Sequence, residues 1–441
     1  MSNPRALNDI KFKKTDGGMG RAAGSDDVIS GLIFAGMGAE LVFGDAAGNV
    51  KGFVEAAVDA QGNPVSYVRR FTYPEELEDA DIKFTPKPEN ATLTPVQIAK
   101  NVLHYHIAEF FRMNPEGVLY VMVKKGTAEV AVTTTNNSGV TTDGDITVLQ
   151  TFAGGNIRQV GVFNPSLLDV AAVQKECTEE GTGLEAKHRP LSVVLTHCGR
   201  TSSESDGVTT LAPLELSALP DKISGGRCNV SVLIGSDFDA DLVDALGNYA
   251  YYGCIGVCIG AISKASVHES IAWVGKFPLG LKAPAFFNGA LVRNTSVSDL
   301  ELLNGKHYIF AVIHAGDADN YFNDSHTLDV DSSDYAYIEN VRTIDKACRG
   351  IRGKLLPWLN SPLRVDPSNG QLESGMVSFL ETTAGEALEE MEKAGEISGY
   401  KVEIDPAQNV LATSALEIVI KKVPVGVMRK VTVKIGYTTS L

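Results

Sequence analysis

Several groups of residues in this sequence have the types and spacings from which ligand sites are built. Glycine-rich stretches of the kind that cradle phosphates occur at GGMGRAAG (Gly17 to Gly24) and at Gly36-Met37-Gly38. The first lacks the pattern G-x-x-x-x-G-K-[ST]. The second is followed by Ala39 and Glu40 and misses G-x-G-x-x-G. Neither stretch therefore predicts a nucleotide site.

An acidic run at Asp237, Asp239, Asp241 and Asp244 is spaced like the start of a calcium loop. An EF-hand loop that begins at Asp237 needs glycine at its sixth position and glutamate at its twelfth. This chain has Leu242 and Asn248 there. Carboxylates are favourable at the positive end of a helix dipole, so the run is interpreted as the beginning of a helix.

The stretch HAGDADNYF offers candidate catalytic side chains at His314, Asp317 and Asp319, after an apolar strand. Catalytic groups of α/β proteins often lie just after such a strand. His268, Glu269 and Ser270 are adjacent, but adjacent residues do not by themselves form a nucleophile–base pair. The chain has no G-x-S-x-G elbow and no H-E-x-x-H motif. The sequence predicts no catalytic residue, no cofactor and no metal ligand, and we expect a protein that is not an enzyme.

The cysteines are sparse and irregular and do not form the framework of a small disulfide-rich secreted domain. The chain has 6 of them: Cys177, Cys198, Cys228, Cys254, Cys258 and Cys348. Cys254 and Cys258 would share a face of a helix, but no second pair follows at zinc-ligand spacing, so we interpret both as buried structural thiols. The start of the chain lacks the apolar core of a signal peptide, and YAYYGCIGVCIGAI is shorter than the ~20 residues that span a bilayer. We expect a protein made in a reducing cytosol, without membrane insertion.

Composition indicates a globular protein. The 441 residues are 44% hydrophobic and 21% charged, with a formal net charge of −15. The acidic balance argues against a nucleic-acid platform, which needs clustered basic charge, and is typical of a soluble, self-repelling surface. The length suggests two or three domains at roughly 100–200 residues each.

Alternation of apolar strands and helices predicts an α/β (mixed α+β) fold. A helix should begin at Thr94, an N-cap residue followed by Pro95 at the first helical position. Further helical residues are expected in DADLVDALGNYAYYGCIG. Buried strands are expected at 118–123, 191–197, 229–235 and 307–316. Strands of continuous apolar character with helices between them imply a sheet covered on both faces.

Two helices of opposite charge are predicted near the C-terminus. The first covers 338–355, ends before Pro357 and carries basic residues that include Arg342, Lys346 and Arg349. The second covers about 372–394, ends at Gly395 and carries acidic residues that include Glu386, Glu389 and Glu390. These charges are either two solvated faces or an electrostatic pairing, within one subunit or between subunits.

Strand patterns lie at both ends of the chain. The apolar residues that alternate with polar ones are Leu416, Ile418 and Ile420, then Val431, Val433, Ile435 and Tyr437, and near the start Ile10 and Phe12. A terminal strand leaves unpaired N–H and C=O groups that natural proteins pair or cover. We therefore predict arms at residues 1–27 and 411–441 that pair with another part of the assembly.

The C-terminal hundred residues resemble a known family. The order is a basic helix (YIENVRTIDKACRGIRGKLLPWL), an extended stretch (SPLRVDPSNG), an acidic helix (SGMVSFLETTAGEALEEMEKAGEI) and two strand segments. It is similar to the C-terminal domain of contractile tail sheath proteins of myovirus-like phages and related injection particles. The motif G-x-I-x-G-Y-x-V-x-x-D-x-x-x-N carries much of the likeness, at Gly395, Ile397, Gly399, Tyr400, Val402, Asp405 and Asn409.

Upstream, SDDVISGLIFAG, GAISKASVHESIAWVGKFPL and FFNGALV resemble sheath-like proteins of Bacteroidetes phages and prophages. The stretch from about residue 52 to 145 matches neither pattern. The resemblance implies a multidomain sheath protomer: an N-terminal arm at 1–27, a central α/β region at 28–330 of one or two domains with an outer insertion, and a C-terminal sheath domain at 331–441.

The resemblance also implies a function. Sheath subunits form stacked hexameric rings around an inner tail tube, exchange terminal strands with neighbours and contract to drive the tube through a cell envelope. Implied partners are other copies of the chain, the inner tube protein, and baseplate and tail terminator proteins, in a virion or phage-tail-like particle assembled in the bacterial cytoplasm. The assembly residues would be the apolar arm residues and the charges of the two helices named above.

Two other functions stay open from the residues alone. A cytosolic α/β enzyme with a nucleotide or small-molecule site near Gly235 or Gly316 would explain the strand–helix alternation but not two strand-bearing termini. A tail tube protein of the same particle would be shorter and mostly β.

Overall fold

The fold is described from a computed structural model. It describes residues 26–37, 41–59, 61–126, 128–135, 141–164, 168–178, 183–197, 200–205, 208–213, 215–223, 228–368, 370–408 and 410–438, with only the backbone for 200–205 and 208–213. The expected strand around Ile10 and Phe12 lies outside the described residues.

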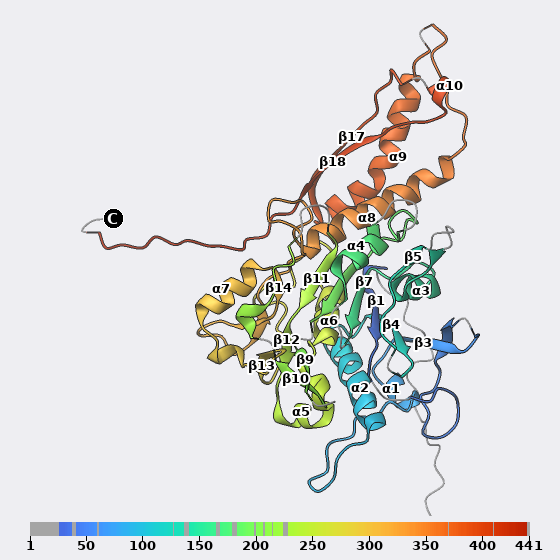
Figure 1. The fold of residues 1–441 in the computed structure, drawn as a ribbon. Helices are drawn as coiled ribbons and strands as arrows, with labels where there is room; N and C mark the ends of the chain where they lie inside the picture. The colour runs from blue at the N-terminus through green and yellow to red at the C-terminus, as the bar shows by residue number, and fades with distance from the viewer. Residues whose placement is uncertain are drawn as a thin grey trace, which may run out of the picture.

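A mixed sheet of 8 strands forms the centre of the protein (Figure 1), which confirms the predicted α/β class. Its order is β14 (Tyr308–Ile309), β11 (Val230–Leu233), β8 (Ser192–Thr196), β7 (Gln159–Phe163), β1 (Ile29–Phe34), β4 (Val118–Lys124), β3 (Pro64–Phe71) and β2 (Val54–Val58). The strands from β14 to β4 are parallel, whereas β3 and β2 are antiparallel to their neighbours. In the middle, Leu32 lies opposite Val121 and Gly161.

Helices cover both faces of this sheet, as the apolar strands predict. One face packs against α2 (Pro95–Met113), α5 (Ala240–Leu246) and α6 (Ile255–Lys264), and the other against α3 (Asp145–Phe152), α4 (Val170–Thr178) and α7 (Val297–Gly305). Alternate strand residues enter the two cores: Leu32 and Phe34 the first, Ile33 the second. Successive side chains of a strand point to opposite faces, so a strand buried on both sides must be apolar throughout.

The start of α2 follows the predicted chemistry. The Thr94 side chain accepts a hydrogen bond from the Gln97 backbone N–H, and the Gln97 side chain accepts one from the Thr94 N–H in return, with Pro95 at the first position. This capping box satisfies two backbone donors that the helix itself cannot.

Two sequence expectations were wrong in detail. The segment 307–316 is two strands, because the chain leaves the large sheet at Phe310, whose N–H donates to the Asn323 side chain. β15 (Ala311–Ile313) then pairs with β16 (Asn320–Phe322). The helical stretch before α6 is broken after α5, where Gly247 has a positive φ of 58° and a 3₁₀ turn (Gly247–Tyr251) follows.

We call residues 26–337 the body. Its remaining elements are small and lie outside the large sheet. They are α1 (Glu76–Asp79), the pairs β5 (Thr134–Thr135) with β6 (Thr141–Thr142), β9 (Arg200–Ser205) with β10 (Val208–Pro213) and β12 (Gly235–Asp237) with β13 (Pro284–Phe286), and the 3₁₀ turns Asp26–Val28, Leu216–Ala218 and Val292–Asn294.

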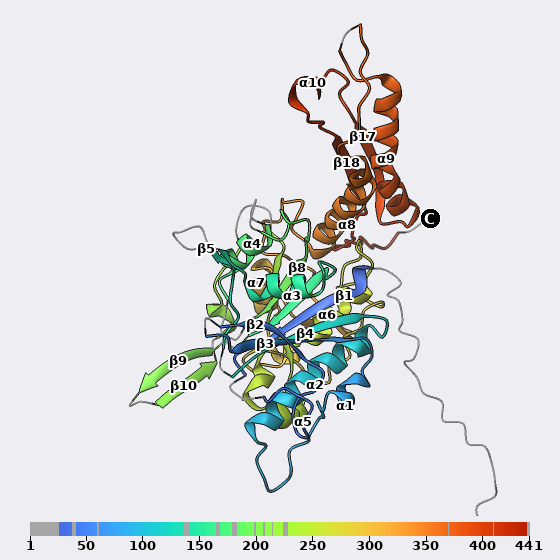
Figure 2. The same cartoon turned by 90° about the vertical axis from the view of Figure 1, so that its right-hand side faces the viewer.

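The C-terminal elements project from the body as an upper unit, residues 338–424 (Figures 1 and 2). It contains α8 (Ile338–Leu355), the 3₁₀ turn Leu356–Trp358, α9 (Ser374–Lys393), β17 (Ile397–Glu403), α10 (Val410–Thr413) and β18 (Val419–Pro424). Both predicted helices are confirmed, and Gly395 follows α9 with a φ of 75°, as a helix-ending glycine does.

The structure corrects the predicted C-terminal arm. The first expected strand is β18, which pairs with β17 of the same chain and places Ile420 against the small core that contains Ala347 and Leu388. It therefore belongs to its own subunit. From residue 425 to 438 the described chain is extended without forming a strand, and it reaches far from the folded units (Figure 1). We call this segment the C-terminal arm.

Among the described residues, no single helix has the length and apolar character to cross a membrane. The stretches Ala240–Tyr251 and Ile255–Lys264 reach that composition only together, and they are bent by 88°. The second of them, α6, is buried in the core of the body.

Candidate assembly site

The residues considered for chemistry have structural roles where the chain is described. Asp237 is buried and accepts hydrogen bonds from the backbone N–H groups of Lys282 (3.0 Å) and Ala283 (2.8 Å). Asp239 directly precedes α5 and Asp241 lies in its first turn, so the interpretation as a helix start is confirmed for these two residues, whereas Asp237 belongs to β12. Cys254 and Cys258 are buried in the core, where burial raises the pKa of both thiols.

The histidine candidates are not assembled into a catalytic group. His314, Asp317 and Asp319 lie exposed on the loop between β15 and β16. The Ser270 hydroxyl donates to the Ser325 hydroxyl (3.2 Å), and Glu269 forms an ion pair with Lys276. Neither Gly235 nor Gly316 lines the grooves found beside α4 and α9.

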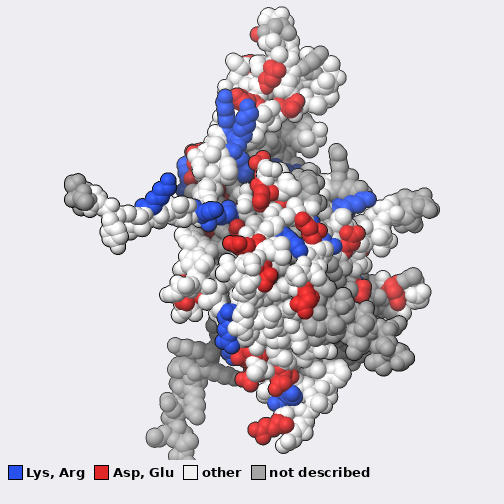
Figure 3. Space-filling model, turned by 60° about the vertical axis from the view of Figure 1, so that its left-hand side comes forward, with Lys and Arg blue, Asp and Glu red and all other residues white. Residues whose placement is uncertain are grey.

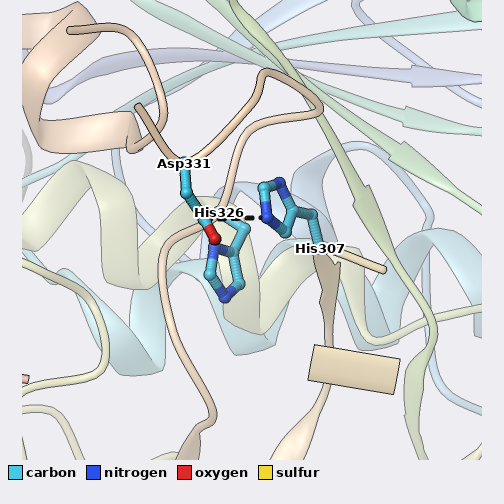
Figure 4. A group of neighbouring side chains, drawn as sticks. All are labelled: His307, His326 and Asp331. Carbon is cyan, nitrogen blue, oxygen red and sulfur yellow. Dashed lines mark ion pairs between the residues drawn. The ribbon is translucent and has the colours of Figure 1, made fainter. Parts of the chain in front are cut away.

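A cluster that the sequence did not predict joins His307, His326 and Asp331 (Figure 4). His307 Nε2 lies 3.0 Å from Asp331 Oδ1, and the two imidazole rings stack with centroids 4.5 Å apart and planes 5° from parallel. A metal ion bound by an imidazole lies in the plane of that ring, and two stacked parallel planes have no point in common. The observed geometry therefore does not hold one ion between both histidines.

The first residues that the structure describes are fixed by charge. The buried Asp27 carboxylate lies 2.8 Å from the Lys346 ammonium and 2.9 Å from the Arg349 guanidinium. Lys346 also contacts Glu396 at 2.6 Å. Burial by itself would raise the pKa of Asp27, but the hydrogen bond from Lys346 and the nearby positive charges outweigh it and lower that pKa. Asp27, which we call the root of the N-terminal segment, is thus bound to α8.

The root of the C-terminal arm, at Arg429, is also fixed by ion pairs, but here the terminal segment carries the positive charge and the folded part carries the negative charges. Arg429 Nε lies 3.0 Å and 3.1 Å from the two carboxylate oxygens of Asp324, and its Nη2 forms an ion pair with Glu339. The guanidinium also covers the Tyr337 ring, 3.4 Å from its centroid. Burial would lower the pKa of Arg429, but the two carboxylates outweigh it and raise that pKa. Burial raises the pKa of Glu339.

Beyond Arg429 the arm is exposed. Its apolar side chains Val431, Val433 and Ile435 are 63%, 78% and 95% exposed. The strand candidate is therefore an extended segment whose apolar face has not been covered. Meanwhile β17 and β18 form a sheet of 2 strands, and no described residue adds a third strand at either edge. One face of this sheet packs against α8 and α9.

The charges of the two C-terminal helices pair in part within the chain. Lys354 of α8 lies 3.2 Å from Glu386 and 2.9 Å from Glu390 of α9, whereas Glu389 pairs with Lys393 of its own helix. Arg342 is buried and donates to the backbone carbonyls of Ala265 (3.1 Å) and Ser266 (3.3 Å). The basic residues thus face several partners, not one acidic surface.

An acidic groove of about 540 Å³ lies between α9 and β17. Its lining includes three acidic side chains, Glu381, Glu389 and Glu392, and one basic side chain, Lys401. Figure 3 displays acidic and basic side chains interspersed over the body, with basic side chains on the projecting C-terminal arm. Those of the arm beyond its root are Lys430 and Lys434.

The ion pairs at both roots were missed by sequence reasoning. Asp27, Glu339 and Arg429 carry no motif, and they are far apart in the sequence. The alternation of apolar residues and the family resemblance predicted an assembly role for this end of the chain, but neither indicated which residues anchor it.

Comparisons with known proteins agree with this geometry. The N-terminal domain of DUF2586 matches residues 89–326, and the C-terminal domain of DUF2586 matches residues 334–441. No curated protein matches the sequence.

Among solved structures, the chain is similar to a protein of the anti-feeding prophage (AFP) baseplate, with 14% identity over 98% of this chain and 99% of that one, at a TM-score of 0.53. It is also similar to the AFP helical sheath in its contracted state, with 14% identity over 99% of both chains and a TM-score of 0.53. The contracted sheath complex of the extracellular contractile injection system PVC gives 11% identity over 99% of both chains and a TM-score of 0.53. These likenesses are of fold along nearly the whole length. The chain therefore belongs to the DUF2586 family, and its fold is that of the sheath proteins of contractile injection systems.

Proposed function

We propose that this protein is the structural subunit of a contractile tail sheath. Copies polymerise into stacked hexameric rings around an inner tube, and shortening of this assembly drives the tube through a target envelope. The role is mechanical and not enzymatic. The partners are other copies of this chain, the tube protein, and baseplate and terminator proteins, in a tail-like particle assembled in the bacterial cytoplasm.

The C-terminal arm is the observation that carries the proposal. An exposed segment with alternating Val431, Val433 and Ile435 has the pattern of a strand without the burial of one. Adding it to an open sheet edge of a second copy would supply main-chain hydrogen bonds and cover the apolar side chains. The edges of the β17–β18 sheet offer such a place.

Charge supports the same partner. The arm carries Lys430 and Lys434 between its apolar residues, and the groove beside β17 is lined by Glu381, Glu389 and Glu392. Opposite charges steer association and fix register more than they add affinity. Because the donor arm and the acceptor edge are different surfaces, each copy can give an arm and receive one. Such a head-to-tail contact builds a helical assembly when the rotation does not close.

Electron microscopy of negatively stained, concentrated protein tests the proposal. We expect hollow tubes or stacked rings from the full chain. A chain that ends after Arg429 keeps β18 and the arm root, and we expect it to stay as single subunits. A deletion after Ala415 would be a poorer test, because it also removes β18 from the sheet of its own subunit.

A matched pair of variants separates the apolar face of the arm from its length. Serine at positions 431, 433 and 435 should prevent polymerisation. Serine at the alternate positions 432 and 436, which carry neither a large apolar side chain nor a charge, should preserve it. If the full chain stayed as single subunits both with and without added tube protein, the proposal that it is a sheath subunit would be contradicted. Normal tubes from the shortened chain would contradict the exchange of the arm.

A further inference from the structure

Both ends of the described chain are fastened to one helix. Asp27 binds Lys346 and Arg349 of α8, and Arg429 binds Glu339 of α8. The charged positions Glu339, Arg342, Lys346 and Arg349 are spaced by three and four residues, so they share one face of the helix. Two segments that are about four hundred positions apart in sequence thus attach to the same face of α8.

The carboxylates of these contacts are largely shielded from water, whereas their basic partners are only partly covered. The exposed fraction of the side chain is 3% for Glu339, 13% for Asp27 and 27% for Arg429. Exposed ion pairs contribute little, whereas removing one partner of a buried pair leaves an uncompensated charge. The two roots are therefore held more firmly than the exposed arm beyond residue 429.

Helix α8 also joins the two folded units. Ile338, its first residue, belongs to the core of the body, whereas Ala347 belongs to the core of the upper unit with Leu388 and Met391. Arg342 and Thr343 bind backbone carbonyls of the loop after α6. A force applied to α8 is thus transmitted to both units.

We propose that α8 mechanically couples the two terminal arms, with Asp27 and Arg429 as the anchor residues. The partner at each arm is another copy of this chain, so the inference rests on the proposed function. A pull on the C-terminal arm passes through Arg429 and Glu339 into α8, and from there through Lys346 and Arg349 to Asp27. The load thereby bypasses β18, an edge strand that a pull on its end would peel from β17 residue by residue.

Pulling single subunits by their two chain ends in optical tweezers tests this coupling without requiring polymerisation. Arg429→Gln should shift the first unfolding event to lower force, because the load then falls on β18. Glu339→Gln should shift it to lower force as well, because Arg429 is then held by Asp324 alone. Asp27→Asn should shift it as well, since it removes the other anchor. Arg352→Ala is the control, because Arg352 is an exposed arginine of the same helix. Circular dichroism of each variant verifies that the subunit is folded, and Arg429→Lys should restore part of the force.

The outcomes are distinct. An unchanged first unfolding force in Glu339→Gln would overturn the role of α8, because the load would then enter the body through Asp324. An equal shift in Arg352→Ala, or no shift in Asp27→Asn, would also overturn the coupling. If the full chain formed no tubes by microscopy, the proposed function would fail, while the forces measured on single subunits would still report on the anchors.

Discussion

The ammonium group of Lys124 lies 2.8 Å from a carboxylate oxygen of Asp145, and the two side chains are only 6% and 4% exposed. Lys124 ends β4, and Asp145 begins α3. The same carboxylate accepts a hydrogen bond from the Ala131 backbone N–H at 2.6 Å. This buried pair fixes the end of a central strand, the start of a covering helix and the loop between them.

Replacing Asp145 by alanine should lower the free energy of unfolding by about 3–5 kcal/mol, because it leaves the Lys124 charge buried without a partner. Urea denaturation measures this. The control is Asp143→Ala, which removes a largely exposed partner of Lys187 at 3.6 Å and should cost less than about 1 kcal/mol. Equal losses in the two variants would contradict the importance of burial.

Gly256 of α6 lies directly against the backbone of His106 in α2, and Gly260 one turn later lies against Phe110. A methyl group at Gly256 would lie only 2.1 Å from the carbonyl oxygen of His106. Gly256→Ala should therefore destabilise the protein by about 1–3 kcal/mol, the usual range for overpacking.

Gly353→Ala is the matched control for this change, because nothing lies within 4 Å of the added atom in α8. It should stabilise the protein by about 0.5–1 kcal/mol through helix propensity. Thermal melting of both variants distinguishes the two effects, and a neutral Gly256→Ala would refute the close approach of α2 and α6.

Burial lowers the pKa of His326 to about 4. Groups that face it are Asp324, the stacked His307, Asp331 and Arg429. The folded state disfavours the imidazolium, so stability should fall as the pH drops from about 6.5 towards 4, by roughly 3 kcal/mol for the full shift. Urea denaturation at pH 7 and pH 4.5 measures this loss.

His326→Phe keeps an aromatic ring beside His307 and removes the titrating group. Its stability should change less between these two pH values than that of the unmodified chain. His314→Ala removes a histidine from an exposed loop and serves as the control. If His326→Phe showed the same pH dependence as the unmodified chain, the loss would arise elsewhere.

Reversing Glu386, Glu389 and Glu390 of α9 to lysine should impair assembly or contraction. The change removes both partners of Lys354 and reverses part of the acidic groove that we propose for the arm. Microscopy of tubes measures the effect, and circular dichroism should record a folded subunit, because all three side chains are substantially exposed. Unchanged tubes and unchanged contraction would count against an assembly role for this face.

The sequence by itself determined the local elements. The capping residues Thr94 and Pro95, the stripe of α8 and the glycine after α9 act over a few residues, so their signals are complete within short segments. The apolar strands also predicted a sheet covered on both faces, because each strand records its own burial in its composition.

The tertiary structure decided what depends on distant partners. The two segments near the C-terminus alternate between apolar and polar residues in the same way. Val419–Pro424 nevertheless forms a strand that pairs with β17 of its own chain, whereas residues 425–438 form no strand. The alternation of apolar and polar residues indicates that one face of a strand will be buried, but it does not indicate whether the same chain or another chain packs against that face. Likewise, the attachment of Asp27 and Arg429 to α8 follows from packing between segments that are remote in sequence, and no local pattern encodes it. Ion pairs depend on charge and distance alone, so their partners are defined only once the chain has folded.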